Sequence, residues 1–452
     1  MASDSWITTI RDSLYDRIPL TAAEVAILST AAFQRLDRVQ QLGFVSKVWP
    51  GAKHTRYEHA IGVLHLMRQA LAALRRHDQQ QLIDDEAAQT ALAAALLHDV
   101  GHYPFSHAIE ELGPPVLPHE EVGRQLVMSG ELAEVLERVW GVSPERVANL
   151  IAPREPLSLA DQLTRQLLSG PLDVDKLDYL PRDARHCNVP YGGVDVARLL
   201  DSLRIAQVEG RWRIVVADKG VSPLHSLMTA RQEMFDNVYW HHTNRACMVM
   251  LQRAVQDALL AGAITAEELP RHDDFSLLER LSDPAMPAST RALIDRLRRR
   301  QLHKRAIEVS ARATDLYNEL SRLFYAPAAR RALEIVLAER LAALTGEPVA
   351  DWEILIDLPK PERWSTDVWV LFERPPLGFR RLMPWTEVVG LGDEDLLRYE
   401  QHRRLVRIVT TERLRQIVAT RWQELLLPLI RPMFAALPLQ RASYDSSAAN
   451  GW

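Results

Sequence analysis

The spacing of apolar residues predicts that about the first 265 residues are mostly helical. Residues 56–76 carry one apolar stripe with helical spacing, which consists of Ile61, Leu64, Met67, Leu71 and Leu74. Residues 86–98 are apolar on nearly every side, a pattern that is typical of a helix buried in a core. Gly101 and Pro104 follow closely and predict that this helix ends near residue 98.

Two further elements are predicted after residue 200. Residues 203–218 have the pattern of a β-hairpin, with Gly210 near its turn. Residues 222–258 are predicted to form another long helical stretch. This part of the chain is therefore expected to be mainly, but not wholly, α-helical.

The pattern changes beyond residue 264. Proline and acidic residues become frequent at 264–288, which indicates a boundary. A basic amphipathic helix is expected around 289–345, and two strand-like segments follow at 352–358 and 368–373.

These patterns predict a mainly α protein: a helical core with a small β-hairpin, and a minor α+β section near the C-terminal end. The expected divisions are 1–265 for the helical core, 266–345 for a helical, basic region, and 346–452 for the small α+β section. No internal repeat and no low-complexity tract is visible.

The composition narrows the class of protein. The net charge of −5 gives no general basic field, so nucleic-acid binding is not indicated, and affinity for phosphate would need a local cluster of cations. The two cysteines, Cys187 and Cys247, exclude a disulfide framework and suit a reducing compartment. No apolar run approaches the roughly 20 residues that span a bilayer, and residues 1–20 lack the pattern of a signal peptide. We expect a soluble, cytoplasmic protein with no membrane partner.

The strongest local signal for chemistry is the dipeptide His98-Asp99 at the end of the buried helix. Adjacent helical residues do not face the same way, so these two side chains can share one ion only where the backbone turns, and Gly101 supplies that turn. An imidazole and a carboxylate suit a divalent metal such as Mn, Fe, Ni or Zn, and Mg is a further candidate. Alone, the dipeptide also fits a histidine capped by its neighbour.

Other residues with suitable chemistry surround this dipeptide in the sequence. His59 lies in the preceding helical stretch, and His102, His107 and His119 follow soon after. If the acidic segment 173–183 is helical, one face would carry Asp175, Lys176, Tyr179, Arg182 and Asp183.

Together these motifs resemble the HD superfamily of phosphohydrolases. Four segments resemble its deoxynucleoside triphosphate (dNTP) triphosphohydrolases, the sterile-alpha-motif/HD-domain enzyme of vertebrates and its bacterial relatives; they are residues 33–63, 96–107, 173–189 and 231–241. The resemblance runs from about residue 18 to about residue 260, with weaker similarity to about residue 375. It implies an HD phosphohydrolase core at 1–265, and we expect no sterile-alpha-motif domain here.

The resemblance also implies roles for the residues of the core. The expected metal ligands are His59, His98, Asp99 and Asp175. The expected acid/base group and its supports are His102, His107, Glu110 and His119, where Glu110 replaces the aspartate of the vertebrate pattern. His119 is the first candidate for the general acid that protonates the leaving 5′-oxygen, because an imidazole beside a carboxylate keeps its proton near neutral pH.

A second group of residues is expected to bind the nucleotide. The resemblance assigns the triphosphate to Arg56, Lys176 and Arg231. It assigns the deoxyribose to Gln41, Tyr179 and Asp183, where the tyrosine ring would exclude a 2′-hydroxyl, and the base to Tyr239 and His241. Any of the three cations could instead be an ordinary surface cation, and Tyr239 could be an ordinary half-buried aromatic residue.

Regulation is harder to predict. The residues that read guanine at the allosteric site of the vertebrate enzyme would fall on Ser29 and Asp37, and both are changed. Arg300 and Lys304 resemble phosphate-contacting residues of that site, so a regulatory anion site is one interpretation. The other is a basic helix face that is solvated or lies at a subunit contact. We expect a homo-oligomer, a dimer or a tetramer.

Three functions are compatible with these residues. The leading hypothesis is metal-dependent hydrolysis of dNTPs to deoxynucleoside and inorganic triphosphate. A phosphatase that removes phosphates from nucleotides stepwise is the alternative within the same class. A nucleotide- or nucleic-acid-binding module with vestigial catalysis is the alternative of another class, although each metal and acid/base position holds a chemically competent residue.

Overall fold

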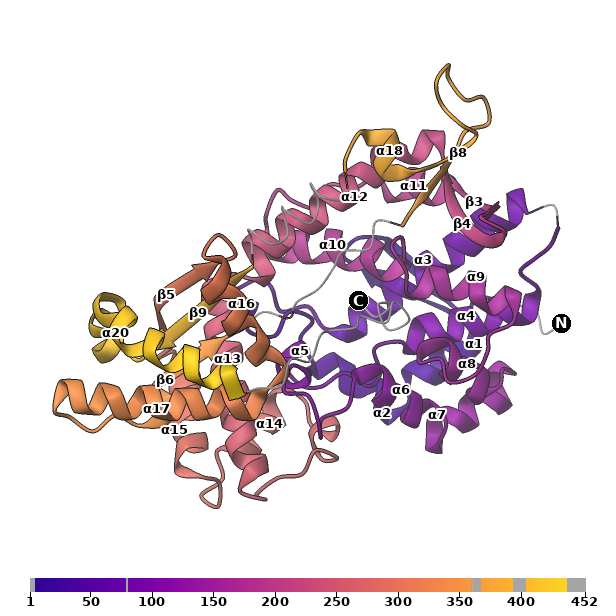
Figure 1. Cartoon of the computed structure of the whole chain (residues 1–452). Coiled ribbons are helices and arrows are strands. Elements are labelled where there is room, and N and C mark those ends of the chain that lie inside the picture. The colour runs from indigo at the N-terminus through magenta and orange to yellow at the C-terminus, as the bar shows by residue number, and fades with distance from the viewer. Residues whose placement is uncertain (1–4, 79, 359, 361–366, 393–403, 437–452) are drawn as a thin grey trace.

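The computed structural model describes residues 5–78, 80–358, 360, 367–392 and 404–436. Within these residues the chain is mainly α-helical, with small sheets, as the sequence predicts. Helices of the first half surround the N-terminal part of the molecule, and a sheet flanked by α17 (Pro327–Thr345) and α20 (Glu412–Ala436) lies at the opposite end (Figure 1). No helix in the described part of the chain is long and apolar enough to cross a membrane.

The first apolar core is built by packed helices of the N-terminal half. Its central members are α3 (Arg56–His77), α4 (Asp85–Leu97), α9 (Leu159–Leu168) and α10 (Val174–Cys187). Asp84 caps α4 by accepting the backbone N–H of Ala87 at 2.7 Å, and α4 ends as predicted, with His98 at its C-cap. The apolar stripe of α3 is buried in this core because it faces α4 and α10.

Shorter helices complete this half of the molecule. They are α1 (Ala22–Leu28), α2 (Ala31–Arg35), α5 (His107–Glu110), α6 (His119–Val127), α7 (Gly130–Val135), α8 (Pro144–Ile151) and α11 (Val196–Asp201). A hairpin that the sequence analysis did not predict precedes them, with β1 (Thr8–Asp12) antiparallel to β2 (Asp16–Leu20). Its two strands have five residues each and are mostly polar, so they show no clear alternation of apolar and polar residues.

The predicted hairpin at 203–218 is present as β3 (Leu203–Val208) and β4 (Arg211–Ala217). It is extended by β7 (Trp369–Leu371), which runs parallel to β4, and by β8 (Leu382–Pro384), which is followed by α18 (Trp385–Val389). A second sheet has the order β5–β9–β6, formed by β5 (Lys304–Ser310), β9 (Leu405–Thr410) and β6 (Ile354–Asp357). Residues 346–452, expected as one section, therefore contribute strands to two sheets.

The two long helical stretches of the second half differ from their predictions. Residues 222–258 form α12 (Val221–Met234) and α13 (His242–Leu260), separated by a π-helical turn at Phe235–Tyr239. The single helix expected around 289–345 is wrong, because the chain forms α15 (Ala288–Arg298), strand β5, α16 (Thr314–Arg322) and α17 in turn. The alternation in β5 was hidden among basic residues on both sides.

Two further apolar clusters hold the second half together. One surrounds α13, α14 (Asp274–Leu281) and α15. The other lies between the β5–β9–β6 sheet and the helices α17 and α20. Helix α13 belongs to the first of these clusters, and its N-terminal end reaches the cavity described below.

Candidate metal and acid/base site

Three helices bring the predicted metal ligands together. His59 lies in the first turns of α3, His98 at the C-terminal end of α4, and Asp175 in the first turn of α10. Ligand atoms of these three side chains all lie within 4.8 Å of one another. Asp99 flanks them, with Oδ1 3.3 Å from His98 Nε2 and Oδ2 3.7 Å from His59 Nε2.

The two histidines point their Nε2 atoms inward because their Nδ1 atoms are already used. His59 Nδ1 pairs with Asp178 Oδ2 at 2.8 Å, and His98 Nδ1 donates to the carbonyl of Ala95 at 2.9 Å. Asp175 Oδ1 lies 3.0 Å from His59 Nε2 and 3.7 Å from His98 Nε2. Among the described residues, both Nε2 atoms are buried without a partner in hydrogen-bond geometry. Two imidazole nitrogens therefore face a carboxylate, an arrangement that a cation between them would satisfy.

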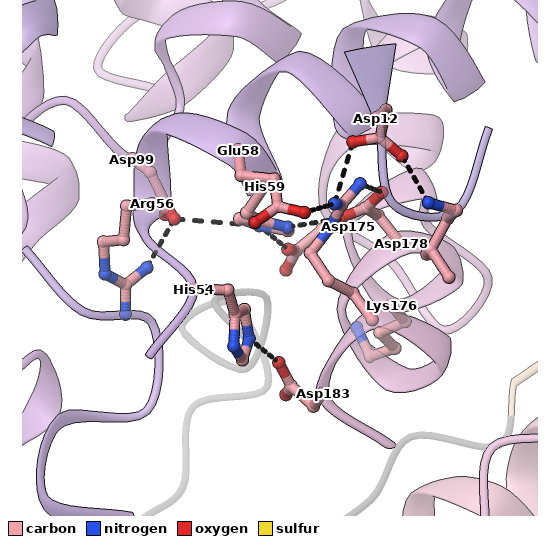
Figure 2. A network of polar contacts seen from close by, with 12 residues as sticks. Asp12, His54, Arg56, Glu58, His59, Asp99, Asp175, Lys176, Asp178 and Asp183 are labelled. Carbon is pink, nitrogen blue, oxygen red and sulfur yellow. Dashed lines mark hydrogen bonds and ion pairs between the residues drawn. The ribbon is translucent and has the colours of Figure 1, made fainter. Parts of the chain in front are cut away.

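The charges of the neighbouring carboxylates support the same interpretation. Asp99 pairs with the guanidinium of Arg56 (Figure 2), and Asp178 pairs with Arg182. Asp175 differs, because among the described residues its carboxylate pairs with imidazoles alone. Although burial raises its pKa, the two neighbouring imidazoles hold the pKa of Asp175 well below its ordinary value. Two imidazole nitrogens and a carboxylate fit a divalent metal of the Mn, Fe, Ni or Zn kind.

A second cluster of histidines lies beside this centre. His102 stacks on His119 with ring centroids 3.8 Å apart, and His107 is nearby. Glu110 joins two of them, since its Oε2 lies 3.0 Å from His119 Nδ1 and 3.3 Å from His107 Nδ1. Glu110 Oε1 also accepts the backbone N–H of His119 at 3.2 Å, which fixes the start of α6 against α5.

Only one of these three histidines has a raised pKa. Burial lowers the pKa of His119, but the charges of Glu110 and Glu120 outweigh it and raise that pKa to about 9. Burial lowers the pKa of His107 to about 4, and burial with the charge of Arg56 holds the pKa of His102 well below its ordinary value. At neutral pH, His119 is therefore the imidazole of this cluster that carries a proton to donate.

One cavity connects both clusters with part of the predicted nucleotide-binding set. The predicted residues that line it are Gln41, Arg56, His98, Asp99, His102, His107, His119, Asp175, Tyr179, Asp183 and Tyr239. Asp183 accepts hydrogen bonds from His54 Nε2 at 2.7 Å and from the Tyr239 hydroxyl at 2.6 Å. The centroid of the Tyr179 ring lies 6.4 Å from that of the Tyr239 ring and 6.5 Å from that of the His59 ring. The sugar-side residues thus lie in the same cavity as the candidate metal centre.

The other predicted nucleotide-binding residues are not among those that line this cavity. Lys176 Nζ donates to Asp173 Oδ2 at 2.5 Å and to the carbonyl of Gly170 at 2.9 Å. The Arg231 guanidinium lies over the ring of Phe235, 5.5 Å from its centroid, and His241 caps α13. The expectation of one shared face on α10 is therefore wrong for Lys176, and also for Arg182, which is buried on the side of Asp178. Asp175, Tyr179 and Asp183 do share the cavity side.

Arg300 and Lys304 do not lie on one helix face. Arg300 has a φ of 58° in the turn after α15 and donates to the carbonyl of Lys47 at 2.6 Å. Lys304 is the exposed first residue of β5. The predicted basic helix face across these two positions is absent because α15 ends at Arg298.

Several residues of the site were not assigned a role from the sequence. Asp178 orients His59, and its position three residues after Asp175 was the available signal. His54 holds Asp183, but its only signal was its nearness to His59 in the sequence. Arg165 on α9 lines the cavity, and no sequence pattern indicated it. Its guanidinium donates to the backbone carbonyls of Leu150 and Ile151. Among the described residues, it forms no ion pair with a carboxylate.

Family models and known proteins match this arrangement. The model of the HD domain matches residues 56–181, and the model of the HD associated region matches residues 194–372. The uncharacterized protein MJ1154 of Methanocaldococcus jannaschii is 30% identical over 301 residues, which is 67% of this chain and 60% of that protein. The human deoxynucleoside triphosphate triphosphohydrolase SAMHD1 is 28% identical over 275 residues, 54% of this chain and 44% of that protein.

The fold is also known from solved structures. A hypothetical protein from Aquifex aeolicus superposes with a TM-score of 0.70 at 24% identity, and the match covers 92% of this chain and 99% of that one. The matches to MJ1154 and to the human enzyme span only 60% and 44% of the lengths of those relatives. A helical core that gathers His59, His98-Asp99 and Asp175 at one centre is the arrangement of an HD domain. The chain belongs to the HD superfamily of phosphohydrolases and resembles the dNTP triphosphohydrolases.

Proposed function

We propose that the protein hydrolyses deoxynucleoside triphosphates to deoxynucleoside and inorganic triphosphate in a metal-dependent reaction. The observation that carries this proposal is the pair of unsatisfied Nε2 atoms of His59 and His98, which face Asp175 in a cavity that also contains a protonated His119. The similarity to a relative named as a dNTP triphosphohydrolase supports the choice of substrate.

His59, His98, Asp99 and Asp175 would hold the metal ion. When bound, such an ion polarises a phosphate oxygen and lowers the pKa of water beside it. The residues of the chain supply the rest of the chemistry. His119 holds a proton that it can give to the 5′-oxygen as that oxygen leaves, and Glu110 keeps the imidazole in place at 3.0 Å.

The sugar would lie against Gln41, Tyr179 and Asp183. Gln41 Oε1 is buried and lacks a hydrogen-bond partner among the described residues, so a sugar hydroxyl would satisfy it. The Tyr179 ring stands in the same cavity and would fill the space beside C2′. The phosphates would lie against Arg56 and Arg165, since Arg165 brings a positive charge whose recorded hydrogen-bond acceptors are neutral carbonyls.

Product analysis tests this function. The protein, loaded in turn with Mn²⁺, Fe²⁺, Ni²⁺, Zn²⁺ or Mg²⁺, is incubated with each dNTP and each ribonucleotide, alone and in pairs, and the products are separated by anion exchange. We expect deoxynucleoside and intact triphosphate from dNTPs, and neither from the Asp175→Asn variant. Orthophosphate with nucleoside diphosphate would overturn the proposal in favour of stepwise removal. Activity that appears only with pairs would indicate an activating nucleotide. The homo-oligomeric state and the cytoplasmic location stay predictions.

A further inference from the structure

The turn of the N-terminal hairpin lies behind the histidine of the candidate metal centre. Asp12 closes this turn, because its Oδ1 accepts the backbone N–H groups of Leu14 at 2.7 Å and Tyr15 at 2.9 Å. The turn thereby aims the Tyr15 side chain at α10, and the Tyr15 hydroxyl donates to Asp178 Oδ1 at 2.8 Å. These two residues are 163 positions apart in the chain.

A fully buried arginine ties the same turn to the same carboxylate. Arg182 donates from Nε to Asp178 Oδ2 at 2.8 Å and from its terminal NH2 nitrogen to Oδ1 at 2.9 Å. Its third nitrogen donates to Asp12 Oδ2 at 2.9 Å and to Glu58 Oε1 at 2.7 Å. Figure 2 shows Asp12 and Glu58 beside Asp178 and His59. Asp12 and Tyr15 of the hairpin therefore contact both members of the Asp178–Arg182 pair.

Asp178 passes this constraint on to the metal centre. Its Oδ2 pairs with His59 Nδ1 at 2.8 Å, which leaves the Nε2 lone pair of His59 directed at Asp175. Asp178 is completely buried, so water does not replace a lost partner easily. A rotation of this carboxylate would change the direction of the His59 ring.

The Asp178–Arg182 pair packs directly against α3 at Gly62. Gly62 lies one turn after His59, and a Cβ at that position would come within 2.0 Å of Asp178 Oδ1 and 2.4 Å of an Arg182 guanidinium nitrogen. The pair occupies the space that a side chain on α3 would fill. The hairpin turn and Gly62 therefore both contact the buried Asp178–Arg182 pair, and Asp178 in turn contacts the candidate ligand His59.

We propose that the hairpin turn at residues 12–16 is a positioning element of the metal centre, and that Tyr15 is its positioning residue. The hydroxyl of Tyr15 holds Asp178 in the orientation that directs His59 Nε2 toward the ion. This inference rests on the metal centre of the proposed function. It assigns to a segment outside the matched HD domain, which begins at residue 56, a part in metal binding.

The test compares Tyr15→Phe with a control in the same hairpin. Arg11→Gln removes an exposed ion pair with Asp16 and leaves Asp178 untouched. Binding of Mn²⁺ to the metal-free full chain is measured by calorimetry, the absorption spectrum of bound Co²⁺ is recorded, and melting temperatures are taken without metal. Loss of a group that orients a ligand typically weakens metal binding roughly 10- to 100-fold, so we expect at least a tenfold weaker affinity and an altered Co²⁺ spectrum for Tyr15→Phe. The control is expected to match the wild type.

A second variant tests separately whether the position of Asp178 affects metal binding. Gly62→Ala places a methyl group against Asp178 from the other side and is expected to weaken Mn²⁺ binding further. Wild-type affinity in a folded Tyr15→Phe variant, or a lower melting temperature without a change in affinity or spectrum, would overturn the positioning role. A wild-type protein that binds no Mn²⁺, Co²⁺, Fe²⁺, Ni²⁺ or Zn²⁺ would instead overturn the metal centre itself.

Discussion

Replacing Glu110 by glutamine should move the alkaline limit of catalysis to lower pH. The change keeps the shape of the side chain and a carbonyl oxygen that can accept a hydrogen bond from His119 Nδ1. In the wild-type protein, this nitrogen lies 3.0 Å from Glu110 Oε2. It removes the negative charge that favours the imidazolium. Under the proposal that His119 acts as the acid, activity is present below its pKa and is lost as the pH rises through that value.

The structure sets the size of this effect. The pKa of His119 is about 9 against an ordinary value of 6.5, and each unit corresponds to about 1.4 kcal/mol of interaction with the charged form. Glu110 is the larger contributor, since Glu120 lies farther away, with Oε2 3.5 Å from His119 Nδ1. An opposite charge this close shifts a pKa by roughly 1–3 units, so loss of Glu110 should lower the pKa of His119 by about two units, which leaves about a tenth of His119 protonated at pH 8. We expect roughly a tenfold loss of rate at pH 8 and little loss at pH 6.

The assay is kcat/KM for a dNTP between pH 5.5 and 10, with the metal saturating at each pH. Glu121→Gln is the matched control, because Glu121 lies on α6, the helix of His119, but pairs with Arg154 at 2.6 Å. The control should keep the wild-type profile. A Glu110→Gln profile that is lowered equally at all pH values, or not shifted at all, would refute the assignment of His119 as the acid whose pKa is set by Glu110.

Three further changes probe the remaining parts of the site. Asp175→Asn should abolish stoichiometric metal binding, measured by elemental analysis, while the melting temperature of the metal-free protein stays close to that of the wild type; normal metal content would exclude Asp175 as a ligand. Tyr179→Ala should raise ribonucleotide turnover relative to dNTP turnover; a variant that only loses about 3–5 kcal/mol of stability, with the rate ratio unchanged, would make Tyr179 a packing residue. Arg165→Gln should raise KM for triphosphates about tenfold or more without changing metal content, since a charge-assisted contact is worth about 1.5–3 kcal/mol; an unchanged KM would remove Arg165 from the phosphate site.

The sequence predicted those parts of the molecule that depend on local pattern. The apolar stripe of α3 and the all-round apolar α4 identified both helices, and the Gly101 turn placed the end of α4 beside His98 and Asp99. The hairpin at β3 and β4 was also visible. In each case the signal lay within about twenty residues, where periodicity and breakers decide the structure.

The parts that were missed depend on contacts between distant segments. Lys176 donates to Asp173, which also caps α10, a contact that the sequence did not predict, and its role as a phosphate-binding cation stays a prediction. The positioning role proposed for Tyr15 depends on its contact with Asp178, which lies 163 positions later in the chain. The residues around Tyr15 in the sequence give no sign of this contact. Strand β5 pairs with β9, about a hundred residues later in the chain, and within the chain segment 289–345 its seven residues are outnumbered by helix formers.

The distribution of charge at the centre explains why these distant contacts matter for function. The chain supplies a cation for Asp99 in Arg56 and for Asp178 in Arg182, and both of these pairs are nearly or completely buried. A buried carboxylate that lacks such a partner is costly, and the Asp175 carboxylate faces two imidazoles instead. Occupied neighbours cannot turn toward Asp175 without breaking their own pairs. The arrangement therefore places the Asp175 carboxylate opposite the Nε2 atoms of His59 and His98, and a metal ion between these three groups would complete it.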